Sequence, residues 1–243
     1  ELYHGEAAYI HDLRWQMYEE EIGTGSWRTL QYEKRKGNLY PTHGLGPVSQ
    51  YMNLLRTEDT FKTLISFSSP ALGREKFARE NFKENHKWNK LNYQNGDINT
   101  TVIKTYLGRT IMVQWDETSP RPYTRLNLIQ GTKGILAGGP TRAAFDNGFE
   151  GYTKDAEEWI IGEGIDALYE KYDHPMYKRL HKITQDSGHG GMDGMMVYRI
   201  IECLRKGEPL DQNVYEGCAW SSLIELTSNS VSYTHLRAHE TPR

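Results

Sequence analysis

Residues 37–47, GNLYPTHGLGP, place Tyr40 and His43 three positions apart among three glycines and two prolines. Glycine permits unusual dihedrals or a close backbone approach, and proline fixes φ, so this segment holds its side chains in place. An oriented histidine suits general acid–base catalysis, in which a proton passes over one hydrogen-bond length. The same pattern is also typical of a tight turn into a helix that begins near Pro47, with His43 as its cap.

Four other segments carry side chains that could serve the same chemistry. A sugar site uses aromatic faces against C–H patches, and it uses Arg, His and Tyr tips for hydroxyl groups. Each residue also fits a structural role: a half-buried strand tyrosine, a solvated arginine, or an acid that balances a helix dipole. The candidates are Tyr9, His11, Asp12 and Arg14 in AYIHDLR, Arg28 in SWR, Arg121 and Tyr123 in TSPRPYTR, and His189 and Asp193 in GHGGMDG.

Composition excludes several classes of protein. The 243 residues carry a net charge of −3, so no strongly basic surface for nucleic acid is expected. No apolar run approaches the roughly 18 residues that a membrane span needs. Two cysteines, Cys203 and Cys218, give neither a disulfide framework nor metal-ligand spacing. The sequence therefore predicts no metal site, no nucleic-acid partner and no membrane span.

The hydrophobic patterns predict an α+β fold. A strand over residues 2–11 precedes a long loop, a short helix over 46–56 and a strand over 61–69. Residues 73–96 are charged and indicate either a helical excursion or a loop. Residues 97–118 and 123–137 each hold two β-rich runs around a tight turn. The remainder is helical, so we expect an open, mainly antiparallel sheet with helices on one face and long loops on the other.

The two ends of the sequence differ from its middle. The chain starts with glutamate, in what reads as a strand already under way. Beyond residue 230 the apolar periodicity of the last helix stops. We expect residues 1–229 to form a substrate-binding and catalytic domain, and residues 230–243 to be a non-native or disordered tail.

Several strings together resemble glycoside hydrolase family 109. They are EAAYIHDLR, GNLYPTHGLGPVSQY, GRTIMVQWDETSPRPYTR, GTKG, GHGGMD and YRIIECLRKGEPLDQNVYEGCAWSSL. That family comprises NAD-dependent α-N-acetylgalactosaminidases, related to the glucose-fructose oxidoreductase and inositol dehydrogenase superfamily. The resemblance implies the C-terminal, substrate-side domain of a two-domain enzyme, with the N-terminal Rossmann domain absent. Trp115 stands where the family usually has histidine, facing either the core or the site.

The resemblance also implies a mechanism and the residues that perform it. NAD takes hydride from C3 of the sugar, the C2 proton becomes acidic, the aglycone is eliminated, and water and hydride then add back. Tyr40 and His43 are the implied catalytic residues, and Tyr40 also meets the nicotinamide. From its glycine-flanked setting we add His189 as a further candidate. The implied substrate contacts are Tyr9, Arg28, Tyr40, Pro41, Thr42, His43 and Tyr123.

Two other functions fit the same sequence. One is a sugar dehydrogenase of the same superfamily, which would release NADH. The other is a non-catalytic domain that binds sugar or joins subunits. A broad open sheet needs cover, so a homo-oligomer formed through its open face is the expected assembly.

Overall fold

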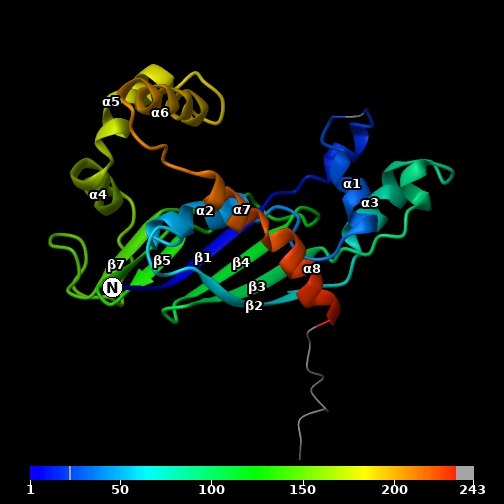
Figure 1. Ribbon diagram of the computed structural model, residues 1–243, viewed down its shortest axis with the longest axis horizontal. Helices are drawn as coiled ribbons and strands as arrows, with labels where there is room; N and C mark the ends of the chain where they lie inside the picture. The colour runs from blue at the N-terminus through cyan, green and yellow to red at the C-terminus, as the bar shows by residue number, and fades with distance from the viewer. Residues whose placement is uncertain (22, 234–243) are drawn as a thin grey trace, which may run out of the picture. The chain divides into compact units, whose positions relative to one another are not determined.

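The computed structural model describes residues 1–21 and 23–233 (Figure 1). These residues form two compact units. The first comprises Glu1–Thr141 together with the chain from Tyr215 onward, and the second comprises Arg142–Val214. The predicted domain of residues 1–229 therefore contains two bodies, of which the first holds the sheet described next.

Six strands of the first unit form an open mixed sheet in the order β2-β3-β4-β1-β5-β6. Only the pair β1–β4 is parallel, and the other four pairs are antiparallel. The predicted hairpins are confirmed as β3–β4 and β5–β6, and so is the mainly antiparallel sheet. The strands are β1 (Leu2–Ile10), β2 (Phe61–Ser68), β3 (Ile98–Thr105), β4 (Thr110–Asp116), β5 (Leu128–Gly131) and β6 (Gly134–Ala137).

Helices α2 (Thr42–Tyr51), α7 (Val214–Ser221) and α8 (Leu223–Tyr233) lie along one face of this sheet (Figure 1). Their contacts form the main apolar core, which confirms the prediction of helices on one face. Burying such side chains contributes about 1.5–3 kcal/mol each. The buried members of this core are Ala7, Leu45, Val48, Met52, Leu54, Ile103, Ile111, Val113, Trp220 and Leu223.

Two local predictions are wrong. Helix α2 begins at Thr42, five residues before Pro47, and Pro47 lies inside it. Leu45 N already donates to the carbonyl oxygen of Pro41, so the helical turn forms before the proline interrupts the ladder. The predicted long loop after β1 contains the short 3₁₀ helix η1 (Arg14–Tyr18) and α1 (Trp27–Lys34). The side chains that α1 buries include Arg28 and Thr29, so apolar periodicity does not reveal it.

The charged segment of residues 73–96 is largely helical. It contains α3 (Gly73–Asn81) and the 3₁₀ helix η2 (Lys87–Lys90). Asp97 caps the start of α3 from outside, because its carboxylate accepts the N–H groups of Leu72 and Gly73 at 2.9–3.0 Å. The helical alternative predicted for this segment is therefore confirmed.

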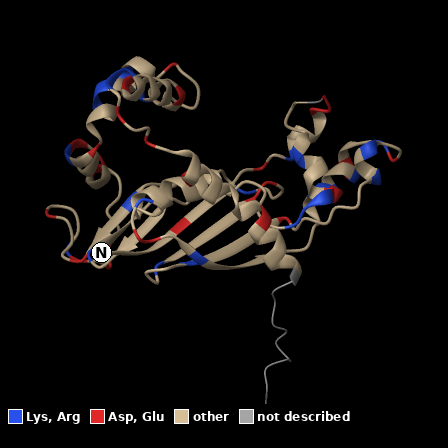
Figure 2. Ribbon diagram, viewed as in Figure 1, with Lys and Arg blue, Asp and Glu red and all other residues tan. Residues whose placement is uncertain are grey.

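The second unit is mainly helical, as predicted. It contains β7 (Arg142–Phe145), α4 (Glu163–Tyr172), α5 (Pro175–Thr184) and α6 (Met192–Lys206). Ala143, Ile160 and Ile165 form its small core. Gly207 ends α6 in the left-handed conformation, at φ +69°. Figure 2 shows acidic and basic residues interspersed along these helices.

The predicted start of the tail falls inside α8. Ser230 is buried, and its Oγ accepts the backbone N–H of Ser66 at 2.8 Å. Residues 230–233 therefore belong to the first unit, while residues 234–243 lie outside the described residues. Among the helices that the structure describes, none has the length and apolarity to cross a membrane. Across the same residues, His, Cys, Asp and Glu form no group of three that could hold a metal ion.

Candidate active site

The start of α2 lies directly on β1. A Cβ atom added to Gly44 would lie 2.4 Å from the backbone nitrogen of Ala8, so only glycine permits this approach. A Cβ atom on Gly46 would meet the ring of Trp220 at 3.2 Å. Gly44 thus lets helix α2 pack directly on strand β1, and Gly46 lets the same helix pack against Trp220. This packing fixes Tyr40 and His43 relative to the sheet.

The rings of three other predicted site residues surround that of Tyr9. The ring centroid of Tyr9 lies 4.8 Å from that of Tyr40, 5.0 Å from that of His43 and 6.2 Å from that of Tyr123. The centroids of Tyr40 and His43 are 4.7 Å apart. Strand β1, the start of α2 and the segment after β4 therefore converge on one aromatic cluster, which brings Tyr9, Tyr40, His43 and Tyr123 together.

Arg28 joins this cluster from α1. Its guanidinium carbon lies 5.3 Å from the ring centroid of Tyr40. The Nε–H donates to Oε1 of Glu117 at 3.1 Å, and Nη1 donates to Oε1 of Gln16, also at 3.1 Å. Arg28 is only 8% exposed, so it is not a solvated surface arginine.

One residue of the site, Glu117, is missing from the candidates, and another, His11, is a candidate that the implied substrate contacts leave out. His11 lies with its Nδ1 atom 3.2 Å from the hydroxyl of Tyr9, and its ring centroid is 5.0 Å from that of Tyr123. The available signal was spacing, because side chains two apart on an extended chain share a face. Glu117 follows β4 and is fully buried beside Arg28. A single acidic residue at a strand end gives no such signal.

Burial sets the protonation of the two hydrogen-bonded rings. It raises the pKa of Tyr9 to about 12, with the negative charge of Glu117 adding to the effect. Burial also lowers the pKa of His11, and the nearby cation of Arg28 lowers it further. At neutral pH the Tyr9 hydroxyl therefore keeps its proton and the imidazole of His11 is neutral. Both can hydrogen-bond a ligand without carrying a fixed charge.

The remaining predicted residues lie in different places. Pro41 is buried immediately before α2, and Thr42 is half-buried at its first position. Trp115 is fully buried, with its ring centroid 5.4 Å from that of Tyr32, so it faces the core. His189 belongs to the second unit, where its Nδ1 atom lies 3.0 Å from the carboxylate of Asp193. That His189 approaches the aromatic cluster stays a prediction.

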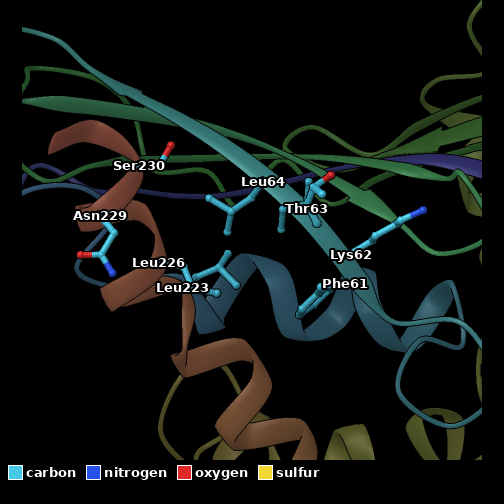
Figure 3. Close-up of a pocket in the computed structure, with 9 residues that line it drawn as sticks. Phe61, Lys62, Thr63, Leu64, Leu223, Leu226, Asn229 and Ser230 are labelled. Carbon is cyan, nitrogen blue, oxygen red and sulfur yellow. The ribbon is translucent and has the colours of Figure 1, made fainter. Parts of the chain in front are cut away.

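A separate cavity of about 370 Å³ lies between β2 and α8 (Figure 3). Its walls are mainly apolar, and Lys62 is the one ionisable residue among them. No residue of the aromatic cluster lines it. This groove therefore offers no acid–base pair. Its lining residues are Phe61, Lys62, Thr63, Leu64, Ile103, Leu223, Leu226, Asn229 and Ser230.

Solved structures define the class of fold. The chain is similar to levoglucosan dehydrogenase in complex with NADH and levoglucosan, with a TM-score of 0.58, 13% identity, and coverage of 95% of this chain and 56% of that chain. It is similar to an NAD binding oxidoreductase from Klebsiella pneumoniae, with a TM-score of 0.60, 12% identity, and coverage of 97% and 58%. The fold is that of an oxidoreductase C-terminal domain.

Sequence comparison defines the family. Residues 1–242 match the family described as "Glycosyl hydrolase 109, C-terminal domain". Glycosyl hydrolase family 109 protein 1 of Akkermansia muciniphila is 60% identical over 96% of this chain and 48% of its own length. A family 109 protein of Shewanella baltica is 56% identical over 96% of this chain and 50% of its own length. The chain belongs to glycosyl hydrolase family 109 and spans about half the length of these curated relatives.

Proposed function

We propose that this chain supplies the substrate side of the active site of an NAD-dependent α-N-acetylgalactosaminidase. The observation that carries the proposal is the convergence of Tyr40, His43 and Tyr123 on the ring of Tyr9, at centroid distances of 4.8, 5.0 and 6.2 Å. Membership of glycosyl hydrolase family 109 supports a glycoside hydrolase parent. Aromatic rings with hydrogen-bonding tips suit the mixed apolar and hydroxyl surface of a sugar.

The described residues fit one end of the proposed cofactor. Tyr40 is half-buried and uncharged, and it lies against two other rings, which suits a flat nicotinamide. When bound, NAD supplies a hydride acceptor that returns the hydride, so the sugar undergoes no net oxidation. In the printed sequence no G-x-G-x-x-G follows a strand, so we assign no pyrophosphate contact to this chain.

The residues divide into two roles. Tyr9, Arg28 and Tyr123 hold the sugar through their ring faces and polar tips. Tyr40 and His43 hold and move protons at the reacting part of the sugar, where a group must switch between donor and acceptor. Their neighbour Tyr9 stays protonated, since burial raises its pKa to about 12, so it can donate throughout.

The test uses a chimaera that joins the N-terminal part of the A. muciniphila relative to this chain. Aglycone release from an aryl α-N-acetylgalactosaminide is measured together with NADH. We expect aglycone in large excess over NAD and no stoichiometric accumulation of NADH. The unaltered relative serves as the control for cofactor loading. A chimaera that binds NAD but releases no aglycone would refute the proposal.

A sugar dehydrogenase is the second candidate. The fold's likeness to levoglucosan dehydrogenase in complex with NADH favours it. In that case the same assay gives one NADH for each sugar consumed, and a free sugar serves as substrate as well as a glycoside. The ratio of NADH to aglycone therefore separates the two functions.

We also retain the proposal that a second copy covers the open face of the sheet. Ile65 and Val102 are paired in register on neighbouring strands and are 41% and 45% exposed, and Phe67 on the same strand as Ile65 is 53% exposed. Such an apolar row is a common site of association. Replacing Val102 with lysine should then lower the oligomeric state in analytical ultracentrifugation. An unchanged sedimentation coefficient would contradict this assembly.

A further inference from the structure

Two side chains fix the guanidinium of Arg28 from different sides. Glu117 accepts its Nε–H at 3.1 Å, and Gln16 accepts from Nη1 at 3.1 Å. No hydrogen bond of Nη2 occurs within the part of the chain that the structure describes. A guanidinium has five N–H donors in a rigid fork, so fixing two of its nitrogens orients the third. The remaining amino group is thus oriented before any ligand binds.

Aromatic rings restrict the same group further. The guanidinium carbon lies 4.7 Å from the ring centroid of Trp27 and 5.3 Å from that of Tyr40. Arginine stacks on aromatic faces, and these contacts limit rotation of its plane. Since Tyr40 belongs to the aromatic cluster, the oriented Arg28 lies at the edge of the proposed sugar site.

Stability alone does not explain the placement of Glu117. Its side chain is 1% exposed, and no hydrogen bond of normal geometry reaches its Oε2 atom from the described residues, although the indole of Trp115 is close enough to lower the pKa of the carboxyl group. Burial raises the pKa of this carboxyl group, against the opposing effect of the cations Arg28 and Arg74. A buried polar atom without a partner destabilises the folded state, and buried ion pairs are weak evidence for stability.

A second buried ion pair in the same unit provides the contrast. Asp59 is fully buried and contacts Arg109, but both of its carboxylate oxygens are satisfied. Oδ1 accepts the N–H of Leu107 at 2.9 Å, and Oδ2 accepts from Thr105 at 2.9 Å and from Arg109 at 2.6 Å. Asp59 thus joins the β3–β4 turn to the strands, which is a structural task. Glu117, in contrast, uses its one hydrogen-bonded oxygen to accept from Arg28, which lies beside the aromatic rings.

We propose that Glu117 is a positioning residue, which orients Arg28 so that its free amino group binds an oxygen of the sugar. This inference rests on the proposed function, because it needs a sugar in the aromatic cluster. Glu117, which the sequence analysis did not predict, would then affect the affinity for the sugar only by orienting Arg28. The effects of altering the two residues must therefore be coupled.

The test is a double-mutant cycle on the chimaera, read as the affinity for N-acetylgalactosamine by calorimetry. A hydrogen bond to a charged group contributes about 1.5–3 kcal/mol, so Arg28→Ala should weaken binding by roughly 10–100-fold. Glu117→Gln should weaken it by roughly 10-fold. The double variant should bind no more weakly than Arg28→Ala, because the lost orientation matters only while Arg28 is present. Multiplying effects would overturn the inference.

Two further variants separate positioning from folding. Asp59→Asn should lower the melting temperature and leave sugar affinity within about twofold, since Asp59 serves the fold. Gln16→Ala removes the second side chain that holds the guanidinium of Arg28, and Gln16 is partly exposed. This variant therefore tests the orientation of Arg28 even if Glu117→Gln does not fold. Gln16→Ala should weaken the binding of N-acetylgalactosamine a few-fold in the parental chimaera, and it should not weaken binding further in the Arg28→Ala variant. Equal losses in both backgrounds would contradict the inference.

The outcomes distinguish this inference from the proposed function. A parental chimaera that binds N-acetylgalactosamine and shows no coupling between the two residues retains the proposed function and loses only the inference. A parental chimaera that binds no sugar contradicts both, because Arg28 then has no ligand to meet.

Discussion

Strands β1 and β4 lie side by side and run parallel. The residues along this pair fall into two regions, one in the apolar core and one beside the candidate site. Ala7 pairs with Val113, and both lie in the apolar core under α2, α7 and α8. Two residues further along, Tyr9 pairs with Trp115, and both are buried beside Tyr32, while the ring of Tyr9 also contacts the other rings of the candidate site. The same pair of strands therefore changes from a packing surface to a candidate site within one step of the pleat.

The two regions differ most in their buried polar atoms. Around Tyr9, Tyr32 and Trp115, seven residues bury side-chain nitrogen or oxygen atoms that have no hydrogen-bond partner in the described part of the chain. At the apolar region, Ser49 and Trp220 do so. Unsatisfied polar groups cost stability and gather where function requires them. The seven residues are Tyr32, Asn38, Arg74, Asn95, Trp115, Asp116 and Glu117.

The largest expected effect concerns turnover at the aromatic cluster. In the chimaera, Tyr40→Phe and His43→Ala should each lower kcat by about 10²–10⁴-fold, because losing a general acid or base has this effect. This corresponds to about 3–5 kcal/mol of activation free energy. KM should change little. Steady-state kinetics at saturating NAD would measure both values.

The matched control for turnover lies in the apolar core. Leu45 is fully buried on α2, two residues after His43. Leu45→Ala should lower the free energy of unfolding by about 3 kcal/mol while kcat per folded molecule stays within twofold. If Leu45→Ala lowers kcat as much as Tyr40→Phe does, the two regions are not functionally distinct.

The next effect concerns the contact between helix and strand. Gly44→Ala should lower the free energy of unfolding by about 3 kcal/mol, because the new Cβ atom would lie 2.4 Å from backbone of Ala8. Gly46→Ala should cost about 1 kcal/mol or less, since its Cβ atom meets only the side chain of Trp220 at 3.2 Å. Denaturant titration compares the two variants, and equal losses would show that α2 is not held against β1.

A smaller effect is expected for binding of the sugar. Tyr123 is 49% exposed, and its ring lies at the edge of the cluster. Tyr123→Ala should raise KM by about 10-fold, or roughly 1.4 kcal/mol, with kcat nearly unchanged, because the ring binds ground state and transition state alike. Tyr215→Ala is a control at a tyrosine that is 82% exposed. A selective fall in kcat for Tyr123→Ala would assign Tyr123 to the chemistry instead.

The smallest effect is a pH dependence at His11. Burial and Arg28 lower the pKa of His11, so the folded state binds fewer protons than the unfolded state between the two pKa values. The free energy of unfolding should therefore fall as the pH drops below the ordinary histidine value of about 6.5. His11→Asn should remove this fall. NMR titration should show the pKa of His11 rising in Arg28→Gln, and an unchanged pKa would contradict the Arg28 contribution.

Much of the sheet could be predicted from the sequence. Strands β3 and β4 are β-rich runs on either side of a short turn, and β5 and β6 are two more around residues 132–133. These signals are local. The parallel pairing of β1 with β4 joins residues about a hundred positions apart, such as Tyr9 and Trp115, and no turn signal specifies it.

The site was predictable to a similar degree. The motifs gave Tyr9, Tyr40, His43 and Tyr123, which the structure brings together. Helix α1 was not visible, because it buries Arg28 through a hydrogen bond to a residue 89 positions away. Pairs of this kind depend on tertiary contacts rather than on periodicity. Glu117 could not be predicted for the same reason, because its contact with Arg28 is also a tertiary one.

One measurement tests the central claim most directly: a crystal structure of the chimaera with N-acetylgalactosamine. We expect the sugar to contact the rings of Tyr9, Tyr40 and Tyr123, with Arg28 bonded to one of its oxygens. A sugar bound in the groove between β2 and α8 (Figure 3), with the aromatic cluster empty, would contradict the account.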